Sequence, residues 1–265
     1  MDFSRAQYKA VIAEIEAGIK TLQGKLTEVK PAAHAAANHW WVNPAFGAAM
    51  EKLADLSVEA GTAIAQWVID VLKGASAPIW MFVDAYNWMN LRSTANGVST
   101  DLSTQNLVID DSDWSGDARE KYLASAGAQA SAAARLGSIA TTTSATLAGC
   151  AAAGLLFYIS VAAVVAKLIA ATTASIAAMG TGVFSMTGAA LLLETAGFSS
   201  AVLTGATATL ATFLTSQVTA VILLHGDAID PGSFPGGVWP KSNTSQFSDA
   251  TVKDDDADWS LKKKD

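Results

Sequence analysis

The first part of the chain has apolar side chains at alternating spacings of four and three residues. They are Tyr8, Ile12, Ile15, Ile19, Leu22, Leu26 and Val29. This spacing lines one narrow face of a helix and is typical of a coiled coil or a helical bundle. The sequence therefore predicts a helix over residues 8–29, and we expect Pro31 to end it. Because an apolar stripe needs a partner, we expect this helix to form an antiparallel pair with the helix that follows Trp114.

A second helical pattern covers residues 47–72, where apolar side chains again recur at helical spacing. Residues 32–46 lie between the two patterns and carry His34, His39, Trp40 and Trp41, and we expect them to form an aromatic connection. The two histidines lack the four-residue spacing of a pair on one helix face and have no acidic or cysteine residue near them in sequence. We therefore expect no metal site there.

Residues 79–91 are dense in aromatic residues and methionine. This composition suits a packed helix of a bundle, and it also suits a partner-binding face. Residues 92–113 are rich in Ser, Thr, Asn, Gly and Asp without periodicity, so we expect a long connection. After it, small and apolar residues from Ala118 to Ile139 return to spacings of four and three and predict another long helix.

The stretch beyond Arg135 has almost no charge, with Lys167 and Glu194 as the only Asp, Glu, Lys or Arg before Asp227. It consists mainly of Ala, Gly, Thr, Ser, Leu, Val and Ile and predicts apolar helices. We expect glycines to punctuate them: a turn at Gly180 and Gly182, breaks near Gly188 and Gly197, and an end at His225–Gly226. The remainder is polar and rich in Pro, Gly and Asp, and we expect a flexible tail.

Composition narrows the possible functions. Hydrophobic residues make up 51% of the 265 residues and charged residues 15%, so much apolar surface must be hidden. A net charge of -7 gives no reason to expect a phosphate-binding surface, so we expect no nucleic-acid partner. The single cysteine, Cys150, lies among small apolar residues and predicts a buried hydrophobe. No basic start with an apolar run follows Met1, so we expect a leaderless route if the protein is exported.

The peptide Asp113-Trp114-Ser115-Gly116-Asp117-Ala118-Arg119 leads into one of the predicted long helices. It resembles the Trp-x-Gly turn of the WxG family of type VII secretion substrates. The resemblance covers residues 1–145 loosely, and because the Trp-x-Gly hairpin is fused to further helices, the chain looks more like the extended actinobacterial members than the small ones. The resemblance implies that Trp114 and Gly116 are structural turn residues, with the indole packed across the neighbouring helices. It also implies export in a folded state. The family's secretion signal, a Tyr followed four residues later by an acidic residue, does not occur here, so export would depend on a partner that carries it.

The fold class that these patterns predict is all-α, an elongated helical bundle with a Trp-x-Gly helix-turn-helix and a C-terminal apolar helical region. Composition divides the chain into a WxG-like bundle at 1–145, an apolar region at 146–226 and a flexible polar tail at 227–265. No phosphate-binding loop, nucleophile elbow or zinc-protease motif is present in the sequence. We therefore expect neither an enzyme nor a cofactor nor a metal.

Two functions remain. The first is an exported virulence protein, secreted or held in the cell envelope, whose apolar helices act at a membrane and oligomerise into a pore. Lys167 and Glu194 would then face protein or water, while Gly197, Ala201 and Gly205, one turn apart, would allow close helix packing. The second is a soluble interaction or chaperone-like protein of a secretion system, whose apolar helices form a core or a partner interface. The partners expected are a second copy of the chain, a helical secretion partner or a membrane.

Overall fold

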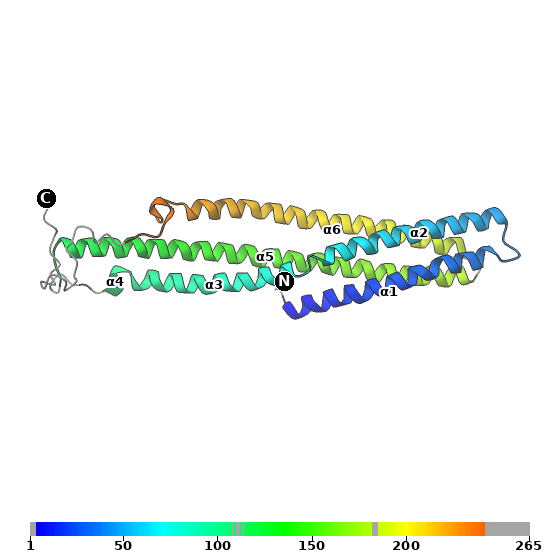
Figure 1. The fold of residues 1–265 in the computed structure, drawn as a ribbon, viewed down its shortest axis with the longest axis horizontal. Coiled ribbons are helices and arrows are strands. Elements are labelled where there is room, and N and C mark those ends of the chain that lie inside the picture. The colour runs from blue at the N-terminus through cyan, green and yellow to red at the C-terminus, as the bar shows by residue number, and fades with distance from the viewer. Residues whose placement is uncertain (1–3, 108, 110–111, 113, 182–184, 242–265) are drawn as a thin grey trace, which may run out of the picture. The chain divides into compact units, whose positions relative to one another are not determined.

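The computed structural model describes the whole chain except residues 1–3, 108, 110–111, 113, 182–184 and 242–265. The elements are α1 (Arg5–Ala37), α2 (Pro44–Leu72), α3 (Ala77–Asp101), α4 (Thr104–Leu107), α5 (Asp117–Gly180), α6 (Ser185–Ala228) and the 3-10 helix η1 (Pro235–Gly237) (Figure 1). Within the described residues no strand occurs. The all-α prediction is confirmed.

The chain folds into two compact units, each made of two separate stretches of sequence. Unit 1 comprises Met1–Phe82 and Ala148–Ser216, and unit 2 comprises Val83–Leu147 and Gln217–Asp265. The helices α3, α5 and α6 each pass from one unit to the other. The change of composition expected at residue 146 thus falls close to the point at which α5 enters unit 1.

In unit 1, α1 and α2 form an antiparallel hairpin. Ser4 caps α1 by accepting a hydrogen bond from the Gln7 N–H, and Asn43 caps α2 in the same way. The predicted apolar stripe of α1 is confirmed, because these of its members are buried: Tyr8, Ile15, Ile19, Leu22, Leu26 and Val29. Gly61 of α2 is what lets the helices approach, since a Cβ there would lie 2.8 Å from the Leu26 side chain.

The apolar face of α1 also packs on α5, as expected, but the orientation is opposite to the prediction. Tyr8 contacts Tyr158, and Gly18 lies against Val165, so the residue numbers rise together and the two helices are parallel. The reason is that α2 runs antiparallel to both. Spacing along one helix does not encode the direction of its partner, which depends on how often the chain reverses in between.

Pro31 does not end α1, which continues to Ala37. Proline removes one backbone hydrogen bond from a helix interior. Here Ala33 and Ala36, which follow the proline, are buried, so tertiary packing supports the last turns of α1.

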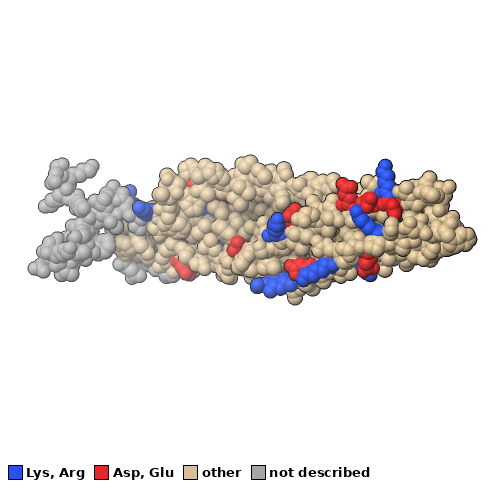
Figure 2. Space-filling view, turned by 45° about the vertical axis from the view of Figure 1, so that its right-hand side comes forward, with Lys and Arg blue, Asp and Glu red and all other residues tan. Residues whose placement is uncertain are grey.

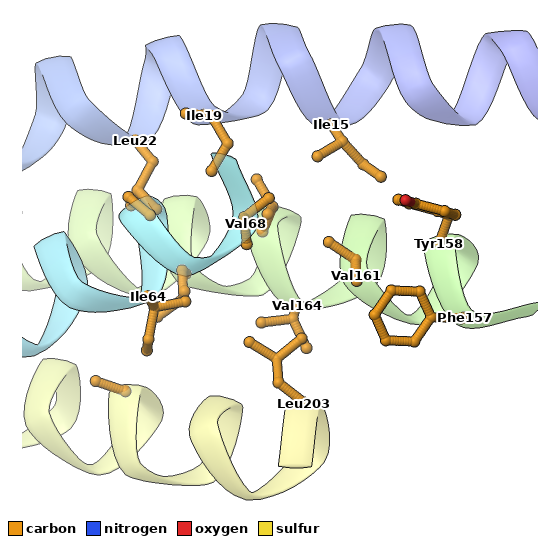
Figure 3. Close-up of a cluster of buried hydrophobic side chains, with 14 of the residues drawn as sticks. Ile15, Ile19, Leu22, Ile64, Val68, Phe157, Tyr158, Val161, Val164 and Leu203 are labelled. Atoms are coloured by element: carbon orange, nitrogen blue, oxygen red, sulfur yellow. The ribbon is translucent and has the colours of Figure 1, made fainter. Parts of the chain in front are cut away.

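The core of unit 1 is built from four helices (Figure 3). Ile15, Ile19 and Leu22 of α1 meet Ile64 and Val68 of α2, while Phe157, Tyr158, Val161 and Val164 of α5 and Leu203 of α6 complete the cluster. A second cluster lies further along the same helices and contains Val29, Ala33, Ala54, Met179 and Leu192. The apolar part of α5 is therefore a core element of this unit.

In unit 2, α3 and α5 are antiparallel. Gly137 of α5 lies against Asn96, and the Ser144 hydroxyl donates to the Ala85 carbonyl at 2.8 Å. The prediction that residues 92–113 form a long connection is therefore wrong for its first part, because α3 continues to Asp101. The polar residues of this stretch suit an exposed helix face, and Ala95 supplies its buried contact.

The helix breaks expected near Gly188 and Gly197 are also absent, since α6 runs unbroken through both residues. Within unit 2, Asp227 in the last turn of α6 pairs with Arg135 of α5. Beyond α6, the Pro240 carbonyl accepts a hydrogen bond from the Gln129 side-chain amide of α5 at 3.0 Å.

Candidate functional site

Helix α6 is held by one narrow stripe over its C-terminal half. All residues of α6 after Leu203 are described, and none of them is buried. Its partly buried positions alternate at spacings of four and three: Ala206, Leu210, Phe213, Gln217, Ala220, Leu224 and Asp227. A stripe of this width is the seam of a coiled coil rather than the broad apolar face of a core helix.

The side of α6 away from this stripe is apolar and open to solvent. Its exposed large side chains are Leu214, Val218, Val221, Ile222 and Leu223, which are 41 to 65% exposed. Among the described residues, two helices are long and apolar enough to cross a membrane. The most apolar window of α5 has a mean hydropathy of 2.1 and is half buried, whereas that of α6 has 1.6 and is not buried at all. These exposed apolar side chains on one helix, which stand among exposed Thr and Ser residues, make α6 a candidate interaction surface.

Two open grooves flank α6 within unit 1. One, of about 470 Å³, lies between α5 and α6, where Gly149, Ala152 and Ala153 leave room beside Leu210 and Phe213. The other, of about 500 Å³, lies between α2 and α6 and is lined by residues that include Ile64, Trp67, Leu203, Thr207 and Ala211. Small side chains along the helices create both grooves. Both sides of α6 are therefore accessible between residues 200 and 213 of unit 1.

The charged residues predicted for this region lie on the surface of unit 1. The Lys167 ammonium group of α5 lies 3.6 Å from the centre of the Phe198 ring of α6, a cation–π contact. Glu194 of α6 is exposed. The two groups stand on neighbouring helices, and the Lys167–Phe198 contact fastens α6 to α5.

The predicted packing residues Gly197, Ala201 and Gly205 are all exposed. A Cβ added at Gly197 or Gly205 would meet no atom within 4 Å. Within this chain the small residues therefore form an open strip on α6 and do not join two helices. A close approach of α6 to α5 occurs instead at Gly188, where a Cβ would lie 2.9 Å from the Ser175 carbonyl oxygen.

The Trp-x-Gly peptide lies immediately before α5, in unit 2. Gly116 has a φ of 95°, which glycine adopts without strain, so a glycine is favoured immediately before α5. The Trp114 ring lies against Tyr122, with ring centres 5.4 Å apart, and is 37% exposed. The indole thus packs on the helix that it precedes. The neighbouring residues Asp110, Asp111 and Asp113 lie outside the described part of the chain.

His34 has an acidic partner that sequence proximity did not reveal. Its Nδ1 lies 2.7 Å from Glu51 Oε1 across the α1–α2 hairpin, and Lys30 pairs with Asp55 beside it. Over the described residues, no three His, Cys, Asp or Glu side chains form a group that could hold a metal. Cys150 is only half-buried, which is more exposed than expected.

No protein-family model, curated protein or solved structure matches the chain. Function must therefore be inferred from the surfaces of the chain itself. Sequence reasoning identified the apolar region but missed the narrow seam of α6. The spacing of Leu210, Phe213, Gln217 and Leu224 was the signal that could have found it.

Proposed function

We propose that this protein acts at membranes, and that its apolar hairpin of α5 and α6 enters the bilayer conditionally. One observation carries the proposal: residues 204–226 of α6 contain no Asp, Glu, Lys or Arg, and none of them is buried. Water is a poor solvent for such a face, whereas hydrocarbon is a good one.

The length of α6 permits a span. Residues 195–226 contain no Asp, Glu, Lys or Arg. About 20 helical residues cross a hydrocarbon core of about 30 Å, so this run exceeds the requirement. Its Gly, Ser and Thr content lowers the driving force, because these residues favour the bilayer less than Leu, Ile, Phe or Val do. Marginal insertion of this kind suits a protein that also exists in a water-soluble form.

The two helices differ in what they would lose on insertion. The part of α6 after Leu203 would give up only a narrow seam, whereas α5 would give up core contacts of Phe157, Val161 and Val165 with its neighbours. We therefore propose that α6 enters first and that α5 follows only when α1 and α2 separate from it. Lys167 and Glu194 would stay at the aqueous side or face protein, since a lysine at the centre of a span opposes insertion by about 2.5–3.5 kcal/mol.

Export and assembly complete the proposal. The turn at Gly116 supports a type VII substrate that travels folded to the cell envelope or the medium, as the resemblance of the Trp114 peptide implies. The open strip of Gly197, Ala201 and Gly205 supports association of copies within the bilayer, because small residues one turn apart let helices approach closely. Oligomers of this kind could form a pore.

The test is vesicle flotation and dye release with the full chain at neutral and acidic pH. A lysine on the exposed face of α6, Ile222→Lys, should leave the helix content unchanged but should strongly reduce both signals. The matched control is Thr21→Lys, an exposed position on α1. If the parent neither floats nor releases dye, or if the two lysine variants behave alike, the proposal is wrong.

A second function is favoured by a different observation. The apolar window of α5 is half buried, and its side chains form the core of unit 1, as they would in a soluble interaction or chaperone-like protein. In that case the grooves beside α6 would receive a partner helix. A chain that stays soluble without detergent, ignores vesicles and forms a defined complex with a helical secretion partner would support this second function.

A further inference from the structure

The end of unit 1 that contains the α1–α2 connection is formed by stretches without acidic residues, lysine or arginine. Residues 35–50 and residues 168–193 contain no Asp, Glu, Lys or Arg. The second core cluster, with Val29 and Ala33 of α1 beside Met179 and Leu192, brings these two stretches to the same end of the unit. Figure 2 shows charged side chains that stop short of this end, at the right of the view, on the face that is visible. The last ion pair before it is Lys30–Asp55, beside the hydrogen bond between His34 and Glu51.

Large aromatic side chains are exposed at this uncharged end. Trp40 is 90% exposed and Trp41 52%, and Phe46 at the start of α2 is exposed as well. The rings of His39, Trp40 and Trp41 contact one another. Trp41 stacks on His39 with ring centres 4.4 Å apart, and Trp40 meets Trp41 edge to face at 5.5 Å. His39, Trp40 and Trp41 therefore form an exposed aromatic cluster.

The backbone of the connection makes its hydrogen bonds locally. The Asn38 side chain donates to the His34 carbonyl, the Val42 N–H donates to the His39 carbonyl, and the Asn43 side chain accepts from the Ala45 N–H. A turn whose polar groups are paired in this way loses less when water is removed. The cost of placing the connection in a lipid headgroup region is correspondingly low.

We infer that His39, Trp40, Trp41 and Phe46 form an anchor that binds the interfacial region of a lipid bilayer, with this end of unit 1 directed toward the membrane. Tryptophan favours this region because its ring is apolar while its N–H still finds a polar partner. Because this end has no Lys or Arg, electrostatic attraction to anionic lipid does not contribute, and binding to a neutral lipid interface is sufficient. The inference rests on the membrane activity proposed above, and it adds which end of unit 1 makes first contact.

The test uses the full chain and vesicles of pure phosphatidylcholine in 0.5 M salt. We expect the parent to float, with Trp40→Ala reducing the partition coefficient roughly tenfold, as loss of one buried aromatic side chain implies. The matched control is Trp80→Ala, which removes a tryptophan that is 62% exposed on α3 and should partition like the parent. Tryptophan quenching by lipids brominated near the headgroup should fall in Trp40→Ala and persist in Trp80→Ala.

Several outcomes separate this inference from the proposed function. Flotation that depends on Trp40 without any dye release supports the anchor and contradicts insertion of the hairpin. Flotation and dye release that depend on Ile222 but not on Trp40 contradict the anchor alone. The anchor is also wrong if Trp80→Ala loses as much as Trp40→Ala, if binding requires anionic lipid, or if Trp40→Ala only converts a lipid-free dimer into a monomer. A parent chain that does not float contradicts both.

Discussion

Tyr8 of α1 and Tyr158 of α5 meet edge to face, with ring centres 5.6 Å apart and an angle of 89° between the rings. Both hydroxyls donate to backbone carbonyls around the C-terminal end of α2: Tyr158 to Val71 of its last turn at 2.9 Å, and Tyr8 to Ala75 of the turn that follows at 2.8 Å. The Val71 carbonyl also accepts a hydrogen bond from the Gly74 N–H at 3.0 Å. This pair therefore fixes α1, α5 and the end of α2 together in unit 1.

Removal of either hydroxyl should destabilise the protein. We expect Tyr8→Phe and Tyr158→Phe each to lower the free energy of unfolding by about 0.5–1.5 kcal/mol, because one hydrogen bond is lost while the ring packing is kept. Urea denaturation followed by circular dichroism measures the change. Tyr122→Phe, at an exposed tyrosine, should change stability by less than about 0.5 kcal/mol. Equal stability of all three variants and the parent would show that the two hydrogen bonds contribute nothing.

The same pair predicts how stability depends on alkaline pH. Burial, followed by the neighbouring Tyr158, raises the pKa of Tyr8 above the ordinary tyrosine value of about 10. Above pH 10 the unfolded chain loses this proton while the folded chain keeps it, so stability falls as the pH rises. Below pH 10 the contribution is fully present. We expect Tyr8→Phe to lose stability less steeply than the parent above pH 10, as thermal or urea melts at stepped pH would show. Parallel curves for the two proteins would contradict this assignment.

The presence of the helices and the face that each one buries follow from the local sequence pattern. The residues at which helices end, and whether two packed helices are parallel or antiparallel, do not. The spacing from Tyr8 to Val29 predicted the buried face of α1, because a periodic stripe is a property of one helix. Pro31 and Gly188 were expected to end or break helices, but packing against other helices outweighs their local preference. The sequence showed aromatic residues around Trp40 but not their exposure, because the exposure depends on how the α1–α2 hairpin folds.

Two glycines of α6 should respond in opposite ways to alanine. Gly188→Ala places a Cβ 2.9 Å from the Ser175 carbonyl oxygen, and backbone on both sides must shift, so we expect a loss of about 1–3 kcal/mol in unfolding free energy. Gly197→Ala meets open space and removes backbone freedom from the unfolded chain, so we expect a gain of up to about 1 kcal/mol. Thermal melts decide between the signs. A loss at Gly197 as large as that at Gly188 would mean that the strip on α6 is packed after all.

Lys167 should oppose insertion while it stabilises the soluble form. We expect Lys167→Leu to lose about 0.5–1 kcal/mol of folding stability with the cation–π contact to Phe198. Its insertion should become more favourable by about 3 kcal/mol, since leucine favours a bilayer and lysine does not. Dye release should therefore begin at a lower ratio of protein to lipid. Lys20→Leu, at an exposed position of α1, is the control and should leave the threshold unchanged. An unchanged threshold for both would place residue 167 outside any inserted segment.

The turn before α5 gives the last prediction, which concerns folding and export together. Gly116 has a φ of 95°, so Gly116→Val forces a β-branched residue into left-handed backbone at a cost of about 1–3 kcal/mol. Trp114→Ala removes the ring that packs on Tyr122 and should cost about 1 kcal/mol, since Trp114 is partly exposed. Gly127→Ala, a glycine inside α5 with open space around it, is the matched control and should not destabilise the protein.

Measurement of export distinguishes a turn that only stabilises the fold from one that the secretion system recognises. If the peptide around Trp114 and Gly116 serves as a type VII feature, both turn variants should be secreted less than the parent in an export-competent host, even at a temperature where their unfolding curves show them fully folded. Gly127→Ala should be secreted like the parent, and an export-deficient host should secrete none of the four proteins. Folded turn variants that reach the medium as efficiently as the parent would mean that the turn only begins α5, and the resemblance to the WxG family would then carry no information about export.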